Sequence, residues 1–430
     1  MRPVFLLAAI IFFAVSNSGC APEKKPQAEN AKSAPDGADV PPVFSEADLR
    51  LLRAQTEAAH IAADLDIKRL SAQLIICGID GKGRLNRDMR TLLNECPAGG
   101  IMLFRYNLDT STEEIQNLIA ETSACISART RVSDSEDSPE DDDKSLGGIP
   151  PFVAIDHEGG QVSRFKSGVA VLPPAASYGE FAHNGEQDSA LALIEIEADS
   201  FRAGTEIFSL GINMNFAPVA EFLNEYNREF MDSRSYGSDP AFVAEAASAF
   251  IRGMERVGVL CVVKHFPGSA GKDPHLFTSV MNDSIDELNL TISPFSALIG
   301  AGQARALMAA HTLLPARDPA RIASLSPLVM QNWLRDELGF SGIIICDDFS
   351  MAAARRLPAG GSAPADHIAA AVKSLAAGAD MVMVWPPDIR RTHRAIQNAV
   401  ADGSLSTERL REAAARIICE KIRMGLVNVE

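Results

Sequence analysis

Two chemically competent pairs stand within one short segment of the sequence. The segment VVKHFPGSAGKDPH, residues 262–275, presents Lys264 and His265 directly after an apolar run and ends in Asp273 and His275. A carboxylate can orient a nearby imidazole, and a histidine that titrates near neutrality can donate a proton and later accept one. The alternative for Asp273 and His275 is a solvated surface loop with an incidental histidine.

A second candidate is Asp347, which directly follows the apolar run Gly342–Cys346. A carboxylate held at the end of a strand can act as a nucleophile towards the anomeric carbon of a sugar. The alternative is a structural aspartate that caps a helix starting near Ser350. Asp348 suits that capping role better than Asp347 does.

A third candidate pair lies in the segment IDHEGGQVSRF, residues 155–165. Gly159 and Gly160 allow a sharp turn after the apolar run. Asp156 and Arg164 can then both reach a polyol, because the carboxylate accepts hydrogen bonds from hydroxyls and the guanidinium donates them. A structural Asp–Arg pair is the alternative. Neither a GxGxxG nor a GxxxxGK[ST] motif supports phosphate binding here.

Eight short apolar runs alternate with helical patterns and must position these residues. Few of the runs alternate strictly between apolar and polar residues, as is typical of parallel strands covered on both faces. The sequence therefore predicts an α/β fold, a TIM-type (β/α)8 barrel. The predicted strands are 74–79, 100–104, 152–155, 212–216, 259–263, 306–310, 342–346 and 380–384, and helices are expected at 189–208, 241–257, 327–338 and 368–377.

Chemistry in such barrels takes place at the carboxyl ends of the strands. Several ionisable groups follow strands at that edge of the barrel. A single polar strand end would mean little, but the meeting of several there is hard to attribute to chance. They are Arg105, Asp156, Lys264, His265, His311, Asp347 and Asp348.

The composition suits one large barrel with extensions. The chain has 430 residues, of which 47% are hydrophobic, and a net charge of −16, which argues against a nucleic-acid partner. Cys77, Cys261 and Cys346 stand in apolar runs and are expected to be buried thiols rather than disulfide partners. No CxxC or Cys/His cluster suggests a metal, and no cofactor is expected.

The amino terminus carries a separate set of signals. Residues 1–20 combine an early arginine, an apolar run and small residues before Cys20, which indicates a lipoprotein-type signal peptide with Cys20 as the lipidated residue. A plain cleaved signal peptide is the alternative. Residues 21–45 are expected to be a flexible tether and residues 46–430 the catalytic barrel. The acidic, serine-rich stretch 131–145 is expected to be a solvated insertion.

Five segments and their order resemble glycoside hydrolase family three, and more narrowly its single-domain β-N-acetylglucosaminidase branch. The resemblance spans about residues 70–425 and leaves no room for the second sandwich domain of many β-glucosidases of the family. The segments are IDHEGGQVSRF, NFAPVAEF, RSYGSDP, KHFPG and LSPLVMQNWLRDELGFSGIIICDDFSMAA.

The resemblance implies a retaining mechanism with Asp347 as the nucleophile and an Asp–His pair, Asp273 and His275, as the acid/base. The loop Ser269–Lys272 is about two residues shorter than is usual in the branch, and Pro274 separates the pair. Assigning Asp273 and His275 therefore assumes a deletion within this loop. The residues implied to bind sugar hydroxyls are Asp156, Arg164, Arg234, Lys264 and His265.

The resemblance thus implies an exo-acting hydrolase of β-linked N-acetylglucosamine that takes a carbohydrate substrate, with peptidoglycan fragments as the expected source. It is expected in the bacterial cell envelope, attached to a membrane through a lipid anchor. Two other functions stay open: a β-glucosidase or phosphorylase of the same family, and a catalytically impaired lipoprotein that binds wall glycans. The shortened loop favours the impaired binder, whereas the intact charged residues oppose it.

Overall fold

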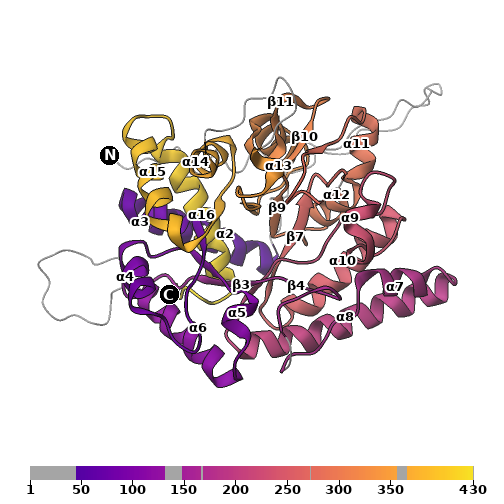
Figure 1. Cartoon of the computed structure of the whole chain (residues 1–430), viewed down its shortest axis with the longest axis horizontal. Coiled ribbons are helices and arrows are strands. Elements are labelled where there is room, and N and C mark those ends of the chain that lie inside the picture. Colours follow the sequence, from indigo (N-terminus) through magenta and orange to yellow (C-terminus); the bar gives the residue numbers. More distant parts are fainter. Residues whose placement is uncertain (1–44, 131–147, 166–167, 272, 356–365, 430) are drawn as a thin grey trace, which may run out of the picture. The chain divides into compact units, whose positions relative to one another are not determined.

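The eight predicted strands form one closed parallel barrel in the computed structural model (Figure 1). The structure describes residues 45–130, 148–165, 168–271, 273–355 and 366–429. Around the barrel the strands follow the order β1-β13-β12-β9-β7-β6-β3-β2. Their bounds are β1 (Ile75–Gly78), β2 (Gly100–Met102), β3 (Phe152–Ile155), β6 (Met214–Asn215), β7 (Leu260–Phe266), β9 (Ala306–Ala309), β12 (Ile343–Cys346) and β13 (Met381–Val384).

Helices surround the barrel, which explains the near-continuous apolar strands. Every residue of β12 is buried, as is every residue of β7, because one face of each strand meets the barrel interior and the other meets helices. The longer helices are α2 (Glu46–Asp64), α3 (Ile67–Gln73), α4 (Arg87–Glu95), α6 (Thr112–Ser127), α7 (Ala175–Ala182), α8 (Glu186–Ser209), α10 (Pro240–Glu255), α11 (Ile285–Thr291), α12 (Ser293–Gly300), η4 (Leu328–Glu337), α14 (His367–Ala377), α15 (Ile389–Ala401) and α16 (Thr407–Arg423).

Short elements decorate the connections between strands and helices. A hairpin follows β3 directly, and a three-stranded sheet is formed by segments after β7 and β9. These elements are β4 (His157–Gly159) with β5 (Val162–Ser163), and β8 (Ser279–Val280), β10 (Thr312–Leu314) and β11 (Asp318–Ile322); the short helices are α5 (Arg105–Leu108), α9 (Arg228–Met231), η2 (Asp232–Arg234), η3 (Ala323–Leu325), α13 (Ala352–Arg355) and η5 (Pro386–Asp388).

The fourth and fifth strands differ most from the prediction. β6 has two residues where five were expected, whereas β7 continues three residues beyond Val263 and includes Lys264 and His265. The extension has a structural cause, because Lys264 pairs with Val219 in the loop that follows β6. The Lys264 N–H donates to the carbonyl of Pro218 at 3.0 Å. That support comes from a distant segment, so the local pattern could not reveal it.

The helix predictions are confirmed at all four sites to within three residues at each end. The expected helix 327–338 is a π-helix, η4, rather than an α-helix. The cysteine prediction is confirmed as well, since Cys77, Cys261 and Cys346 are buried free thiols. Residues 1–20 with Cys20, residues 21–44 and the insertion 131–145 lie outside the described residues.

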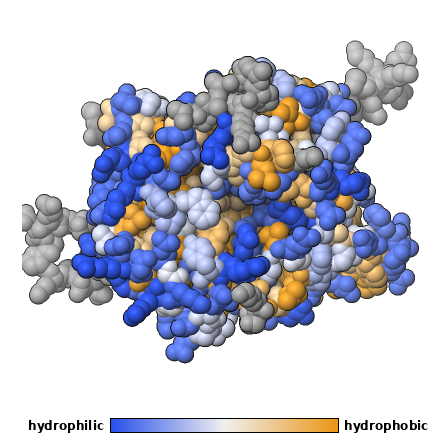
Figure 2. All heavy atoms as spheres, viewed as in Figure 1, coloured by the Kyte–Doolittle hydropathy of each residue, from blue (hydrophilic) through white to orange (hydrophobic). Residues whose placement is uncertain are grey.

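Polar and charged side chains dominate the face seen in Figure 2, with apolar groups in smaller areas between them. In the part of the chain that the structure describes, no helix combines the length and apolar character needed to cross a membrane.

Candidate active site

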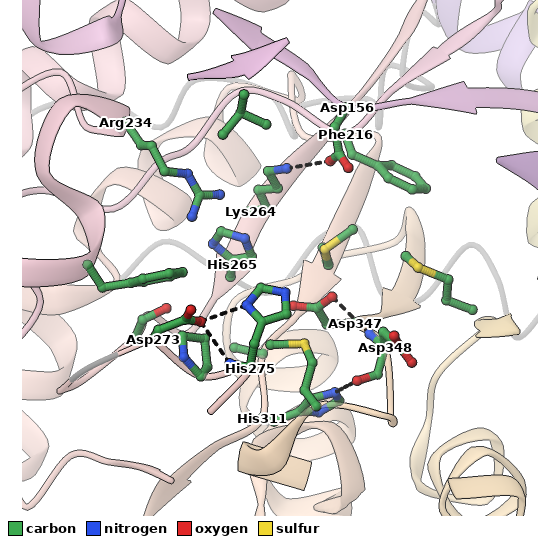
Figure 3. A pocket seen from close by; sticks show the side chains of 18 of the residues that line it. Asp156, Phe216, Arg234, Lys264, His265, Asp273, His275, His311, Asp347 and Asp348 are labelled. Atoms are coloured by element: carbon green, nitrogen blue, oxygen red, sulfur yellow. Dashed lines mark hydrogen bonds and ion pairs between the residues drawn. The ribbon is translucent and has the colours of Figure 1, made fainter. Parts of the chain in front are cut away.

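One pocket at the carboxyl ends of the barrel strands is lined by every described residue that was predicted to catalyse the reaction or to bind sugar. Figure 3 labels all of them except Arg164. The side chains arrive from strand ends and from the loops that follow them, which is where barrel chemistry is expected. The predicted residues that line it are Asp156, Arg164, Arg234, Lys264, His265, Asp273, His275 and Asp347.

A continuous chain of ion pairs forms one wall of the pocket. Lys264 Nζ lies 2.9 Å from Asp156 Oδ1 and 2.6 Å from Glu158 Oε1. Arg164 Nη2 lies 2.5 Å from Asp156 Oδ2. Arg234 donates from Nε and Nη2 to the two oxygens of Glu158 at 2.9 and 2.8 Å. Two carboxylates are therefore held between three cations, and we call these five residues the charged cluster.

Opposite charges outweigh burial throughout the charged cluster. Burial alone would raise the pKa of Glu158, but Lys264 and Arg234 lower that pKa to about 2. The pKa of Asp156 is likewise held well below its ordinary range, against burial, by Lys264 and Arg164. Burial would lower the pKa of Lys264, yet Asp156 and Glu158 raise it. These shifts keep both carboxylates and the Lys264 ammonium charged near neutral pH.

This arrangement suits the recognition of vicinal hydroxyls. Carboxylate oxygens accept from hydroxyls, while guanidinium and ammonium groups donate to them, and fixed donors and acceptors alternate along the wall. The Asp156–Arg164 ion pair that the sequence left as a structural alternative does exist, and both residues also line the pocket. The two interpretations therefore do not exclude each other.

The turn after β3 brings Arg164 back beside Asp156. Gly159 and Gly160 have φ values of 105° and 52°, a region that glycine enters without the steric cost paid by other residues. The chain then reverses through the β4–β5 hairpin. The turn predicted at these glycines is confirmed, and it explains how residues eight positions apart meet.

A buried carboxylate, Glu221, holds the end of β7 in place. Its Oε1 lies 2.6 Å from His265 Nδ1, and its Oε2 accepts from the Ser269 N–H at 2.6 Å. Glu221 therefore fixes the ring of His265 and the start of the loop that leads to His275. Sequence reasoning assigned no role to Glu221, although it belongs to the segment NFAPVAEF.

Asp347 occupies the position predicted for a nucleophile. It directly follows β12 and lines the pocket, and its Oδ1 accepts from the backbone N–H of Asp348 at 2.8 Å. Asp348 has the structural bonds: it accepts from the Ser350 N–H and from Trp385 Nε1, both at 2.8 Å. Asp348 thus makes structural hydrogen bonds of the kind expected of it, although α13 begins at Ala352, and the role of Asp347 as a nucleophile stays a prediction.

Asp273 and His275 form a hydrogen-bonded pair at the same rim. His275 Nδ1 lies 2.7 Å from Asp273 Oδ1, and the His275 N–H donates to the same oxygen at 2.9 Å. Pro274 between them does not separate the pair. The carbonyls of Pro274 and His275 accept from the N–H groups of Ala353 and Ala352, just after the Asp347 strand end. The loop is thus tied to the segment that carries Asp347.

Two other predicted strand-end residues have different surroundings. His311 is buried, and its Nε2 donates to the Asp348 carbonyl at 3.1 Å while Nδ1 lies 2.7 Å from Ser324 Oγ. Burial lowers the pKa of His311, so a neutral ring supports the turn after Asp347. Arg105 donates to the Ser163 carbonyl at 3.2 Å and is not among the pocket-lining residues.

The sequence held a usable signal for Glu158 but a weaker one for Trp385. Glu158 stands two residues after Asp156, and the two-residue period of an extended chain places both on one side. Trp385 follows the last strand, as other predicted site residues follow theirs, but it is not ionisable. Both residues line the pocket.

Known proteins resemble the chain in sequence and in structure. A model of the glycosyl hydrolase family 3 N terminal domain matches residues 64–419. A beta-hexosaminidase of Stenotrophomonas maltophilia (strain K279a) is 33% identical over 319 residues, which are 74% of this chain and 84% of that protein.

Two solved structures of related proteins superpose on the barrel. A glycoside hydrolase family 3 beta-N-acetylglucosaminidase from Paenibacillus sp. str. FPU-7 matches with a TM-score of 0.72 and 29% identity, over 84% of this chain. The chain spans only 63% of that protein's structure. NagZ from Neisseria gonorrhoeae in complex with N-trifluoroacetyl-D-glucosamine matches with a TM-score of 0.61 and 26% identity, over 82% of this chain and 97% of that one.

Proposed function

The chain belongs to glycosyl hydrolase family 3 and is a glycoside hydrolase, and we propose that it is a retaining exo-β-N-acetylglucosaminidase. The observation that carries the proposal is the meeting, in one pocket, of a strand-end carboxylate, an Asp–His pair and a charged cluster suited to hydroxyls. The names of the similar proteins, a beta-hexosaminidase and a beta-N-acetylglucosaminidase, support N-acetylhexosamine as the terminal sugar.

The proposed reaction has two displacements at the anomeric carbon. Asp347 forms a bond to that carbon while the glycosidic C–O bond breaks, and His275 Nε2 gives its proton to the departing oxygen. In the second step the neutral imidazole takes a proton from water, and the water oxygen displaces Asp347. Asp273 holds Nδ1 of the ring, which leaves Nε2 for both transfers.

The test of the nucleophile combines trapping with mutation. A 5-fluoro glycosyl fluoride of N-acetylglucosamine should leave its sugar on Asp347, found by peptide mass mapping, and proton NMR should show the β-anomer as the first product. Asp347→Ala should lose several orders of magnitude in kcat without loss of thermal stability. An α-anomer as first product, or a label on another residue, would overturn the retaining mechanism.

Substrate assays separate the remaining functions. Purified protein should hydrolyse 4-nitrophenyl N-acetyl-β-glucosaminide much faster than the β-glucoside, and phosphate should not replace water as the acceptor. A faster reaction in phosphate buffer with release of the sugar 1-phosphate would identify a phosphorylase. The shortened loop favours a catalytically impaired protein that only binds glycans. In the structure, however, this loop still brings His275 to the pocket, so its length does not support that alternative.

We further propose peptidoglycan fragments as the source of substrate and Cys20 as the site of a lipid anchor in the cell envelope. The support for the anchor is the sequence alone, with small residues before Cys20 after an apolar run. Cys20→Ser should move the protein from the membrane fraction to the soluble fraction with unchanged specific activity. A wild-type protein that already fractionates as soluble would contradict the anchor.

A further inference from the structure

Three aromatic rings are stacked beside the pocket, outside the charged cluster. The ring of Phe104 lies 4.8 Å from that of Trp385 with an interplanar angle of 22°, and 5.8 Å from that of Tyr106 with an angle of 11°. Trp385 and Phe104 line the pocket. Trp385, Phe104 and Tyr106 are called the aromatic platform below.

The backbone around the aromatic platform leaves room for it. A Cβ placed on Gly78, the last residue of β1, would come within 3.3 Å of the Phe104 ring and 3.7 Å of the Trp385 ring. A side chain at this strand end would therefore press into the stack. Tyr106 is fixed at the other side, since its hydroxyl donates to the Ile79 carbonyl at 3.1 Å.

The aromatic platform and the charged cluster occupy different arcs of the barrel. Trp385 follows β13 and Phe104 follows β2, with β1 between these strands. The cluster residues Asp156 and Lys264 belong to the arc from β3 to β7. Asp347 follows β12, next to β13, so the nucleophile stands beside the arc that carries the platform.

The two arcs also differ in depth. The side chain of Lys264 is 3% exposed and that of Glu158 is 6% exposed, whereas Trp385 is 36% and Tyr106 47% exposed. An exo-acting pocket holds the terminal sugar at its closed end, so the leaving group lies towards the open rim. The aromatic platform is at the rim.

A hydrogen bond couples the aromatic platform to the catalytic strand end. Trp385 Nε1 donates to Asp348 Oδ2 at 2.8 Å, and Asp348 is the residue directly after Asp347. The indole is thereby held in a fixed orientation close to the point where the glycosidic bond would break. Aromatic faces stack on flat apolar surfaces, and the C–H face of a pyranose ring is such a surface.

We propose that Trp385, supported from behind by Phe104, is the binding surface for the ring of the leaving group. The proposal rests on the glycosidase function above and adds a specificity for the leaving group. The aglycone of the substrate is a second sugar or another flat ring, not a small alcohol. Trp385 acts as a specificity determinant rather than as a catalytic residue.

The kinetic test compares two substrates that differ only in the leaving group. N-acetyl-β-glucosaminyl fluoride has no ring to stack, whereas N,N′-diacetylchitobiose leaves a sugar. In Trp385→Leu, the ratio of kcat/KM for the disaccharide to kcat/KM for the fluoride should fall roughly 3- to 10-fold, the rate equivalent of one aromatic contact. Trp385→Phe should retain most of the ratio, because it keeps a ring but loses the bond to Asp348.

A matched control is Phe181→Leu, a partly exposed aromatic residue on α7 that does not line the pocket, which should leave the ratio as in the wild type. Equal losses on both substrates in Trp385→Leu would overturn the proposal, because they would place Trp385 in the terminal-sugar site or in support of Asp347. A loss in Trp385→Phe as large as in Trp385→Leu would assign the effect to the Asp348 bond.

If the protein hydrolyses neither substrate, the proposed glycosidase function is refuted. A fluorescence experiment still tests the binding role of Trp385 in that case. The chain has two tryptophans, and Trp333 is 1% exposed, so Trp333→Phe leaves Trp385 as the only indole. N,N′-diacetylchitobiose added to Trp333→Phe/Asp347→Asn should change the emission of Trp385 at concentrations where N-acetylglucosamine does not. The same response to both sugars, or to neither, would contradict the proposal.

Discussion

The charged cluster and the Asp273–His275 loop both pair carboxylates with basic groups, yet they differ in burial. In the cluster, Lys264 and Glu158 are buried and each carboxylate meets two cations. In the loop, the side chains of His275 and Asp273 are 64% and 40% exposed. A buried network fixes geometry and is costly to interrupt, whereas an exposed pair contributes little to stability.

This difference matches what the two regions are proposed to do. A sugar-binding wall gains from donors and acceptors that do not move, because their reorganisation would reduce the binding energy available to the transition state. An acid/base must reach the glycosidic oxygen and later a water, and it must exchange protons with solvent between turnovers. Exposure suits His275 for that exchange.

The largest expected effect comes from removing the cation shared by both buried carboxylates. Lys264→Met leaves Asp156 and Glu158 facing each other without their common partner, and breaking such a buried pair costs about 3–5 kcal/mol. We expect that loss in the free energy of unfolding, measured by chemical denaturation, together with loss of turnover.

Two further variants check the cause of this loss. Lys373→Met alters an exposed lysine on α14 and should leave stability near that of the wild type. Adding Glu158→Gln to Lys264→Met should recover part of the stability, because one uncompensated charge is removed. A Lys264→Met protein as stable as the wild type would mean that the cluster is not an interdependent network.

A substitution in the exposed Asp273–His275 loop should reduce activity strongly and change stability little. His275→Ala should slow disaccharide hydrolysis by about 10²- to 10⁴-fold, the usual contribution of a general acid. Its free energy of unfolding should change by less than about 0.5 kcal/mol, as for other surface substitutions.

Leaving-group dependence tests the chemical role of His275. An aryl glycoside with an acidic phenol needs little protonation, so its glycosylation step should suffer less than that of the disaccharide. Azide, which needs no general base, should restore turnover of the aryl substrate by attacking the glycosyl-enzyme. Equal losses on both substrates and no response to azide would refute the acid/base assignment and point to another group near Lys264.

The charged cluster should also make the stability of the protein depend on pH. The pKa of Glu158 is lowered from 4.5 to about 2, so the folded state gains stability that is complete above pH 4.5 and lost as the pH falls through 2. At 1.36 kcal/mol per unit the contribution is about 3 kcal/mol at neutral pH. Wild type should therefore lose more stability than Glu158→Gln between pH 6 and pH 3, measured by thermal unfolding at fixed ionic strength. Parallel pH profiles would contradict the lowered pKa.

The barrel and most of the pocket could be predicted because their signals are local. Each strand is a short apolar run, and the polar residue that follows a run faces the pocket, as Asp156 and Asp347 show. The contacts that fix the pocket are not local. Glu221 meets His265 across 44 positions, and the β7 extension depends on pairing with Val219. No period or motif in either segment encodes such a meeting, which depends on the assembled barrel.

The smallest expected effect is the loss of activity on substitution of Asp273. The size of that loss shows whether the loop differs in burial from the charged cluster during catalysis as well as in the free protein. In this structure the Asp273–His275 pair is exposed, and an exposed ion pair contributes about 0.2–1 kcal/mol. If the pair stays exposed during catalysis, Asp273→Asn should therefore lower kcat for the disaccharide by no more than about 5-fold. Added salt should reduce even that difference, since an exposed pair is screened. A loss of 100-fold or more, insensitive to salt, would mean that the pair is buried when substrate is bound. The exposed loop would then belong with the charged cluster in the complex, and the contrast between the two regions would hold for the free protein only.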